Sequence, residues 1–331
     1  MSVAPVLIAG AGPVGVITAL ALAQRDIPVR VFEAAERVND TPRASTLHPA
    51  TLEMLAGVGL LDEIVARGLV ARTFQFWDRP ARRLIAEFDH AILKDDTRYP
   101  FVVQCEQHKV ANTAIARLRQ FAHADVRFSS PVTAVAPGND RVDITVEVDG
   151  RPETISGSYL VGADGGRSLV RKSLDIAFEG YTFPERFLVL TSLFDFATEH
   201  GVAYRAYFSD PDEWANLFKV AGDDGLGRWR SVFPTLPGQT DDESLRRFIL
   251  DYCFDFVTMP CVDERLTFAL GHAHGLSSLR SRAATPQQLT LGQHEMIGQC
   301  DAMLQLYRGI DKCAHNDAPV FIAGASGTGK D

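Results

Sequence analysis

A glycine-rich turn near the N-terminus has the residue types that hold the pyrophosphate of a dinucleotide. Residues 10–15 read G-A-G-P-V-G, a G-x-G-x-x-G pattern, and they follow the wholly apolar run Val6–Ala9. Gly10 would make the tight turn, Gly12 would let a pyrophosphate approach the backbone, and Gly15 would let a helix pack on the strand. The N-terminus of the helix that begins here would attract the phosphate groups.

An acidic residue at the end of the next apolar run extends this pattern. The run 27–32 is followed by Glu33, which lies 18 positions after Gly15. A carboxylate in this place can hold both hydroxyls of an adenosine ribose, which disfavours a ribose with a 2′-phosphate. Residues 14–23, between the two runs, are apolar or small, as in a packed helix. These features predict a dinucleotide-binding α/β unit, and a glycine-rich turn in another α/β fold is the alternative.

Three later stretches place polar side chains beside predicted elements. Residues 43–49 (R-A-S-T-L-H-P) precede an amphipathic helix, and residues 104–108 (Q-C-E-Q-H) precede a helix that ends near residue 119. Residues 159–168 read as an apolar strand, a tight turn and a helix start. Asp164 in that turn can accept the hydroxyls of a ribityl or ribose chain. Taken singly, each stretch also fits a solvated charge, a helix cap or a plain turn.

Together these stretches resemble the FAD-dependent aromatic-ring monooxygenases of the p-hydroxybenzoate hydroxylase type, over about residues 1–250. The resemblance implies FAD as cofactor, NAD(P)H as reductant and O2-dependent hydroxylation of a small aromatic or phenolic substrate. It places Arg43 and Gln104 against the flavin, and it identifies no catalytic residue. His48 is a candidate for a polar wall of the substrate pocket, with a surface or core histidine as the alternative. The cofactor residues that it implies are Gly10, Gly12, Pro13, Gly15, Glu33, Arg43, Gln104, Asp164 and Gly165.

The expected fold is α/β, a Rossmann-like FAD-binding domain of the GR2 flavoprotein type with an inserted antiparallel β-sheet domain for the substrate. The FAD-binding domain is expected over residues 1–72 and 100–178, and the substrate sheet over residues 73–99 and 179–250. Clusters of Gly, Pro and Asp separate the strand-like runs of the second set. One such cluster, residues 220–225, is interpreted as a hairpin turn.

The predicted sheet is rich in aromatic residues, which either line a pocket or form plain core. Its strand-like runs include residues 188–196, 203–208, 216–220 and 229–233. The aromatic residues in question are Phe194, Phe196, Tyr204, Tyr207 and Phe208.

Residues 251–331 carry a different set of motifs. Residues 251–282 resemble the last strand and helix of a degenerate bacterial receiver domain, and a plain amphipathic helix is the alternative. Residues 283–331 resemble the start of the AAA+ ATPase domain of sigma-54 activators, with a buried strand over 318–323. The strand runs into G-x-x-x-x-G-K, a phosphate-binding loop that implies ATP by motif alone. Its residues are Gly324, Gly327, Gly329 and Lys330.

Both resemblances break off within a domain. The strand with Gly-Asp and Ala-Ala-His that forms the second FAD motif of the family does not occur in this sequence, so we expect an incomplete or inactive monooxygenase. Contact with sigma-54 RNA polymerase would need further AAA+ parts. The alternatives are a fragment of a sigma-54-dependent regulator and a non-functional gene fusion.

Composition argues against several other classes. The net charge of −9 leaves no basic field for nucleic acid. Five cysteines without a C-x-x-C spacing argue against a zinc site or a disulfide framework and fit the reducing cytoplasm. The apolar stretch 3–23 is broken by three glycines and a proline, so we predict neither a membrane span nor a signal peptide. No metal site is predicted.

Overall fold

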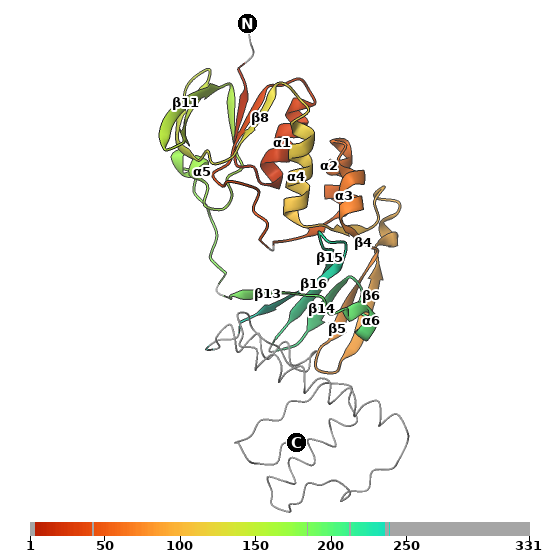
Figure 1. The fold of residues 1–331 in the computed structure, drawn as a ribbon. Coiled ribbons are helices and arrows are strands. Elements are labelled where there is room, and N and C mark those ends of the chain that lie inside the picture. Colours follow the sequence, from red (N-terminus) through yellow and green to blue (C-terminus); the bar gives the residue numbers. More distant parts are fainter. Residues whose placement is uncertain (1–3, 42, 184, 212, 236–237, 239–331) are drawn as a thin grey trace, which may run out of the picture. The chain divides into compact units, whose positions relative to one another are not determined.

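A computed structural model describes residues 4–41, 43–183, 185–211, 213–235 and 238 of the 331 residues. The chain divides into two compact units, residues 1–234 and 235–331. All described helices and strands belong to the first unit (Figure 1). The predicted receiver end, the AAA+ start and the P-loop residues lie outside the described residues.

The first sheet is parallel and carries the glycine-rich turn. Its strand order is β12-β1-β2-β8, and β1 lies between β2 and β12. Every residue of β1 is buried, as the apolar run predicts for a central parallel strand. The strands are β1 (Val6–Ala9), β2 (Val29–Phe32), β8 (Ala124–Arg127) and β12 (Tyr159–Gly162).

Two helices cover one face of this sheet and a second sheet covers the other. α1 (Pro13–Ala23) and α4 (Gln107–Leu118) lie side by side (Figure 1) and share a core with Ile8 and Val31. Leu7 and Phe32, which alternate with these residues along β1 and β2, pack instead on an antiparallel three-stranded sheet. That sheet consists of β9 (Val132–Pro137), β10 (Val142–Val148) and β11 (Arg151–Gly157).

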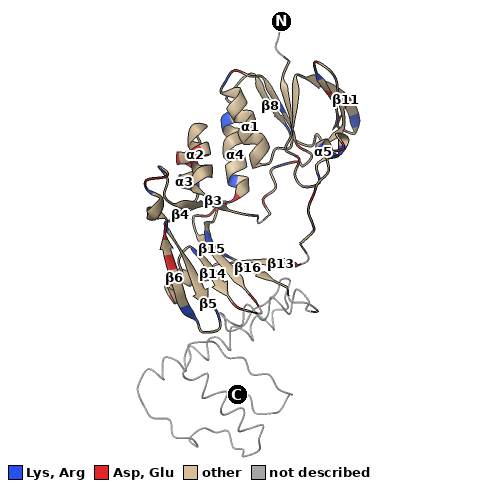
Figure 2. Ribbon diagram, turned by 180° about the vertical axis from the view of Figure 1, so that it is seen from behind, with Lys and Arg blue, Asp and Glu red and all other residues tan. Residues whose placement is uncertain are grey.

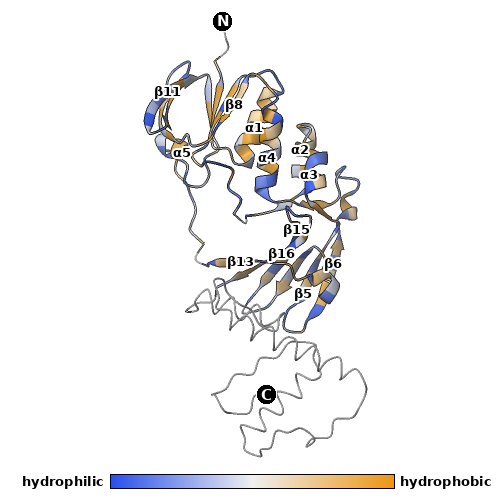
Figure 3. Cartoon of the chain, viewed as in Figure 1, coloured by the Kyte–Doolittle hydropathy of each residue, from blue (hydrophilic) through white to orange (hydrophobic). Residues whose placement is uncertain are grey.

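The distribution of polar residues agrees with these layers. α1 is apolar along its whole length (Figure 3), which suits a helix packed between the sheet and α4. Figure 2 shows charged residues on the outer strands β11 and β6 (Arg83–Asp89) and none on α1. Within the described part of the chain, no helix combines the length and the hydropathy that a membrane crossing needs.

A six-stranded sheet contains the runs predicted for the substrate layer, in the order β13-β16-β15-β14-β5-β6. Four of its five pairings are antiparallel, but β14 and β5 are parallel, so the expectation of a wholly antiparallel sheet is wrong at this pair. The long connection between β5 and β14 allows the parallel arrangement. The remaining bounds are β5 (Thr73–Asp78), β13 (Phe187–Ser192), β14 (Arg205–Ser209), β15 (Ala215–Ala221) and β16 (Gly227–Pro234).

A fourth sheet, of three strands, adjoins β15 and carries the other predicted flavin segments. β7 lies in its centre and pairs antiparallel with β3 and β4. Helices α2 and α3 follow β3 in the chain and pack on each other. The bounds are β3 (Thr46–Leu47), α2 (Pro49–Gly57), α3 (Leu61–Arg67), β4 (Leu69–Ala71), β7 (Val102–Gln104), with η1 (His90–Leu93) after β6 and α5 (Leu169–Ser173) after β12.

The strand predicted over residues 188–196 is shorter than expected. β13 ends at Ser192, and a short helix, α6 (Phe196–His200), follows. Asp195 explains the change of structure, because its carboxylate accepts hydrogen bonds from Trp229 and Lys219 at 2.9 Å. The hydroxyl of Thr198, in the first turn of α6, also donates to it at 2.8 Å. The hairpin at residues 220–225 agrees with the prediction.

The aromatic residues of the sheet divide between core and surface. Phe196 and Phe208 are 3% and 7% exposed and belong to the core. Tyr204 is 37% exposed, and Tyr207 is half-buried and stacks on Phe76. The alternative of plain core therefore applies to two of these residues, and Tyr207 lies on the other face of β14 from Phe208.

Asp195 predicts a pH dependence of stability. Hydrogen bonds from Trp229, Lys219 and Thr198 hold the pKa of its carboxyl well below the usual range. A depressed pKa contributes stability above the unfolded pKa and loses it as pH falls through the folded pKa. Thermal melts of Asp195→Asn should therefore fall below those of the wild type at pH 7. The difference should shrink below about pH 4, and a constant difference across this range would contradict the assignment.

Candidate functional site

The predicted dinucleotide residues gather in a cleft of about 480 Å³ at the carboxyl ends of β1, β2 and β12. The chain leaves β1 for β2 on one side, and β12 lies on its other side. Open α/β sheets bind ligands where the strand order reverses in this way. Gly15 and Gln104 do not line the cleft. The predicted residues that do are Gly10, Gly12, Pro13, Glu33, Arg43, Asp164 and Gly165.

Two of the three glycines are required by the packing of the protein on itself. Gly10 has a φ of +103°, and a Cβ there would lie 2.4 Å from the carbonyl oxygen of Ala163. A Cβ on Gly15 would lie 2.0 Å from the carbonyl oxygen of Gly10. The turn, the start of α1 and the end of β12 thus approach one another more closely than any side chain permits.

Gly12 differs, because nothing in the protein requires a glycine there. Its φ of −65° and ψ of 172° are open to any residue. A Cβ would meet no atom within 4 Å, and Gly12 lines the cleft. The free space beside its backbone is therefore space that a ligand can fill.

The start of α1 has the electrostatic character of an anion site. Gly12 is its N-cap, and no side chain caps the helix. The first turn contains no acidic residue that would compensate the unpaired N–H groups. These groups and the helix dipole attract anions. Since Gly12 and Pro13 line the cleft, a phosphate group in the cleft would reach this helix end.

Glu33 lies at the end of β2 as predicted, but its carboxylate binds the protein backbone. Oε2 accepts a hydrogen bond from the N–H of Ala11 at 2.7 Å, and Oε1 accepts one from Ala35 at 3.0 Å. Each carboxylate oxygen has a second lone pair. Glu33 can therefore hold the glycine-rich turn in place and still accept hydrogen bonds from ribose hydroxyls. This role in ribose binding stays a prediction.

Asp164 likewise has a structural role that the sequence pattern did not indicate. Its Oδ2 accepts hydrogen bonds from the N–H groups of Leu169 and Val170 at 2.7 and 3.2 Å, at the start of α5. Its Oδ1 accepts one from the hydroxyl of Ser168 at 2.5 Å. Only Oδ1 keeps a free lone pair toward the cleft that Asp164 lines.

Gln104 and Ser45 form a pair of buried polar side chains with unused hydrogen-bonding groups. Oε1 of Gln104 accepts a hydrogen bond from Thr46 at 2.8 Å, whereas its Nε2 has no partner. The hydroxyl of Ser45, 2% exposed, also has none. Ser45 directly precedes β3 and Gln104 ends β7, and the N–H of Cys105 bonds to the carbonyl of Ser45 at 2.7 Å. Each such group costs about 1–3 kcal/mol, so this pair fits a ligand that supplies hydrogen-bond acceptors.

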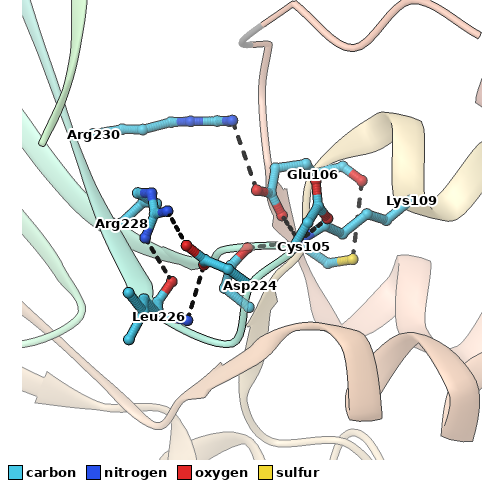
Figure 4. Close-up of polar contacts among 9 residues, drawn as sticks. Cys105, Glu106, Lys109, Asp224, Leu226, Arg228 and Arg230 are labelled. Atoms are coloured by element: carbon cyan, nitrogen blue, oxygen red, sulfur yellow. Dashed lines mark hydrogen bonds and ion pairs between the residues drawn. The ribbon is translucent and has the colours of Figure 1, made fainter. Parts of the chain in front are cut away.

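A buried group of charges beside this pair was missed by sequence reasoning. Glu106 lies between Lys109, whose Nζ is 3.1 Å away, and Arg230, whose Nη2 is 3.8 Å away. Figure 4 shows Arg230 reaching from β16 toward Glu106 and Lys109 on the α4 side. Arg230 also donates to the carbonyl of Arg43 at 3.3 Å, and its Nε has no partner. The i,i+3 spacing of Glu106 and Lys109 was a usable signal, but Arg230 is distant in sequence.

The same charges join α4 to the hairpin between β15 and β16. Nζ of Lys109 donates to the carbonyl of Ala221 at 2.6 Å and lies 3.2 Å from Asp223. Burial lowers the pKa of Arg230, and Glu106 opposes this shift. Burial also raises the pKa of the Cys105 thiol to about 12, so this thiol stays protonated and is no nucleophile. Among the described residues, no group of three or more His, Cys, Asp or Glu side chains is placed to hold a metal.

His48 is the N-cap residue of α2 and is exposed. Desolvation of its ring lowers its pKa, and the charges of Arg205 and His90 add to this effect. His48, which belongs to the predicted segment 43–49, therefore lies near β14 and η1. Its assignment to a pocket wall stays a prediction.

The fold and the cleft define a dinucleotide-binding α/β protein with an additional β-sheet layer. Comparison with known families identifies it further, because the FAD binding domain model matches residues 3–235. The chain belongs to this family. A VpsR domain model matches residues 228–271, and neither match extends to the predicted P-loop residues. The P-loop, ATP and sigma-54 predictions thus have no support from these two matches.

Several known proteins are similar to this chain over part of its length. Para-nitrophenol 4-monooxygenase of Pseudomonas sp. strain WBC-3 is 31% identical over 73% of this chain and 59% of its own length. The 6-hydroxy-3-succinoylpyridine 3-monooxygenase HspB of Pseudomonas putida is 34% identical over 58% of this chain and 49% of its own. The crystal structure of p-nitrophenol 4-monooxygenase PnpA from Pseudomonas putida DLL-E4 superposes with a TM-score of 0.70 and 29% identity. It is matched over 76% of this chain and 62% of its own, so the chain spans less than two thirds of each relative.

Gly15→Ala should destabilise the protein, because the added Cβ would overlap the carbonyl oxygen of Gly10. We expect a loss of about 1–3 kcal/mol in the free energy of unfolding, measured by urea denaturation. Gly12→Ala, with open space at its Cβ, should change stability by no more than about 0.5 kcal/mol. Equal losses for the two variants would show that the glycines do not differ in this way.

The buried charges give a second prediction. Lys109→Met should destabilise the protein by about 3 kcal/mol, since it leaves Glu106 with only the more distant Arg230. Glu106→Gln in the same chain should restore part of this loss, because the uncompensated carboxylate is then gone. A double-mutant cycle in urea measures the coupling. Strict additivity of the two changes would contradict the buried link.

Proposed function

We propose that this chain binds FAD and acts as a monooxygenase that hydroxylates a small phenolic substrate, with NAD(P)H as reductant and O2 as the source of oxygen. The observation that carries the proposal is the cleft at the carboxyl ends of β1, β2 and β12. In it, Gly12 faces open space beside an uncapped helix end. The similarity to para-nitrophenol and 6-hydroxy-3-succinoylpyridine monooxygenases supports the substrate class.

The two halves of FAD would occupy different parts of the site. The backbone at Gly12 and the start of α1 suit the pyrophosphate, and the carboxylate of Glu33 suits the ribose hydroxyls. Arg43, which lines the cleft, leads toward Ser45 and Gln104, whose donors have no partner. The flavin ring system has carbonyl and nitrogen acceptors along one edge, so these buried donors fit the flavin end of the cofactor.

The redox chemistry would be that of the cofactor when it is bound. The chain itself would bind, orient and shield. Glu33 holds the glycine-rich turn through the N–H of Ala11, which keeps the phosphate end in position. Gln104, anchored by Thr46, would donate a hydrogen bond from a dry interior, where such a bond is worth more than in water. No residue is assigned as an acid or base.

The proposed function implies two parts with the following bounds. The FAD-binding part would take residues 1–72 and 100–178, which contain the parallel sheet and the cleft. The substrate part would take residues 73–99 and 179–250, and its described strands β5, β6 and β13–β16 form one sheet. The Lys109–Glu106–Arg230 group links the two parts. The substrate would then lie where the sheet meets the segment 43–47.

Retention of FAD is the direct test. The purified full chain, mixed with FAD and desalted, should keep the visible absorption of bound flavin. Gly12→Ala should raise the Kd for FAD by about 10-fold or more, because its methyl group displaces the phosphate from the backbone N–H groups. Gly57→Ala is a matched control, since its Cβ also has open space but lies in α2, away from the cleft. A colourless protein, or equal affinities for all three chains, would refute the FAD site.

Oxygen transfer needs its own measurement. If the chain retains FAD, NAD(P)H oxidation and O2 uptake should rise when para-nitrophenol or another phenol is added, and a hydroxylated product should appear by mass spectrometry. Oxidation of NAD(P)H without a hydroxylated product, for every phenol tried, would leave a flavoprotein that is not a hydroxylase.

A further inference from the structure

One face of the six-stranded sheet gathers aromatic rings around a single arginine. Phe74, Phe76, Phe88 and Tyr207, called here the aromatic face, come from three neighbouring strands, β5, β6 and β14. Phe76 and Tyr207 are partners in the parallel pair and stack with ring centres 5.1 Å apart. Phe74 and Phe88 are partners in the antiparallel pair and stack at the same distance. Phe88 is 49% exposed, so the face is accessible.

Arg205 lies on this face and is held by the rings themselves. It is two residues before Tyr207 on β14, and its Nε donates to the Tyr207 hydroxyl at 2.8 Å. Its guanidinium carbon lies 5.4 Å from the centre of the Phe74 ring and 5.3 Å from that of Tyr207. Aromatic contacts of this kind orient a guanidinium but do not neutralise its charge. The fork of donors is therefore pre-organised.

No carboxylate forms an ion pair with Arg205 in the part of the chain that the structure describes. Other arginines on or directly next to the strands of this sheet, at least half-buried, do have such partners. Arg79 pairs with Glu213 at 2.6 Å, Arg230 with Glu106, and Arg228 with Asp224. Arg205 thus differs from these arginines, each of which has a carboxylate partner. Its positive charge is available to a group from outside the described residues.

The charge of Arg205 reaches a neighbouring histidine. Arg205 and His90 both interact electrostatically with His48, and the His90 ring lies against Phe74 in a tilted arrangement with ring centres 5.2 Å apart. Nδ1 of His90 contacts the carbonyl of Arg72 at 2.8 Å. The field of Arg205 contributes to the lowered pKa of His48, and no carboxylate contributes to that shift. An anion would complement this place, and a neutral ring would gain only from packing.

The location connects the aromatic face with the cofactor segment. His48 directly follows β3, which pairs with β7 at Gln104. His48, which is near Arg205, is therefore only a few positions along the chain from Arg43, which lines the cleft. An aromatic molecule on the aromatic face would lie beside the segment that the proposed function places against the flavin.

We propose that Arg205 determines substrate specificity by binding the oxyanion of an anionic aromatic substrate whose ring packs on Phe74, Phe76 and Tyr207. The oxyanion is a phenolate oxygen or a carboxylate attached to the ring. The inference rests on the proposed function for the aromatic substrate class, but it concerns binding and can be measured without turnover.

The test compares anions with neutral molecules of the same shape. The purified full chain is titrated by ligand-observed NMR with 4-nitrophenolate and benzoate, and with nitrobenzene and benzamide as neutral analogues. For the anions, Arg205→Gln should raise the Kd by about 10- to 100-fold, as expected for a charge-assisted hydrogen bond. For the neutral analogues the change should stay within about 2-fold, because burial of the ring is unaltered. Loss confined to one anion identifies phenolate or carboxylate as the source, and either supports the proposal.

Two further variants keep the test sharp. Arg83→Gln is a matched control, since Arg83 is an exposed arginine on β6, two strands away from β14 in the same sheet. It should bind every ligand as the wild type does. Arg205→Lys retains the charge without the planar fork and should show an intermediate loss of affinity for the anions. If circular dichroism shows Arg205→Gln to be unfolded, Arg205→Lys takes its place in the test. Equal losses for anions and neutral analogues, or no loss for the anions, would overturn the proposal.

Failure of this inference is separate from failure of the proposed function. A chain that retains FAD but does not distinguish anions from neutral rings would keep its cofactor site and lose the role of Arg205. A colourless chain that binds anions through Arg205 would lose the proposed FAD site and keep the role of Arg205.

Discussion

The arrangement of the nucleotide cleft depends on the close approach of backbone to backbone around the turn after β1. The end of β12 passes so near to the turn after β1 that only glycine fits at Gly10, and the start of α1 passes so near to that turn that only glycine fits at Gly15. This packing sets the direction of α1, and hence of its uncapped N-terminus, toward the cleft. Glu33 adds a second restraint through the N–H of Ala11. Close packing is thus the condition for the electrostatic character of the site.

A second restraint joins the layers around the cleft. Glu106 precedes α4, Lys109 lies in α4, and Arg230 comes from β16 of the six-stranded sheet. The group is buried, and such groups add less to stability than to the choice of one arrangement among several. Because Arg230 also holds the carbonyl of Arg43, the segment that enters the cleft is tied to the sheet that carries the aromatic face. Cofactor and substrate regions of the proposed enzyme are thereby held in a common frame.

Local pattern was sufficient for most elements of this chain. Short apolar runs marked β1, which is buried throughout, and β12, an edge strand whose residues are half-buried or exposed. The glycine turn was recognisable because its spacing reflects steric rules that hold in any protein. The strand at 188–196 was overestimated, because apolar and aromatic residues continue beyond Ser192 and the hydrogen bonds that end it come from Trp229 and Lys219. The parallel pairing of β14 with β5 could not be predicted either, since period-two alternation is the same in both orientations.

The sequence by itself determined the α/β class, the cofactor type of the family and several of the residues that line the cleft, because these depend on short-range spacing and on backbone sterics. The tertiary structure alone decided which polar groups have partners. Gln104 Nε2 and the Ser45 hydroxyl are unpaired, Glu106 is enclosed by two cations, and Arg205 has aromatic rings where its neighbours have carboxylates. Those properties arise from contacts between residues far apart in the chain. Electrostatic and hydrogen-bonding energies depend on distance and burial, which no local pattern encodes.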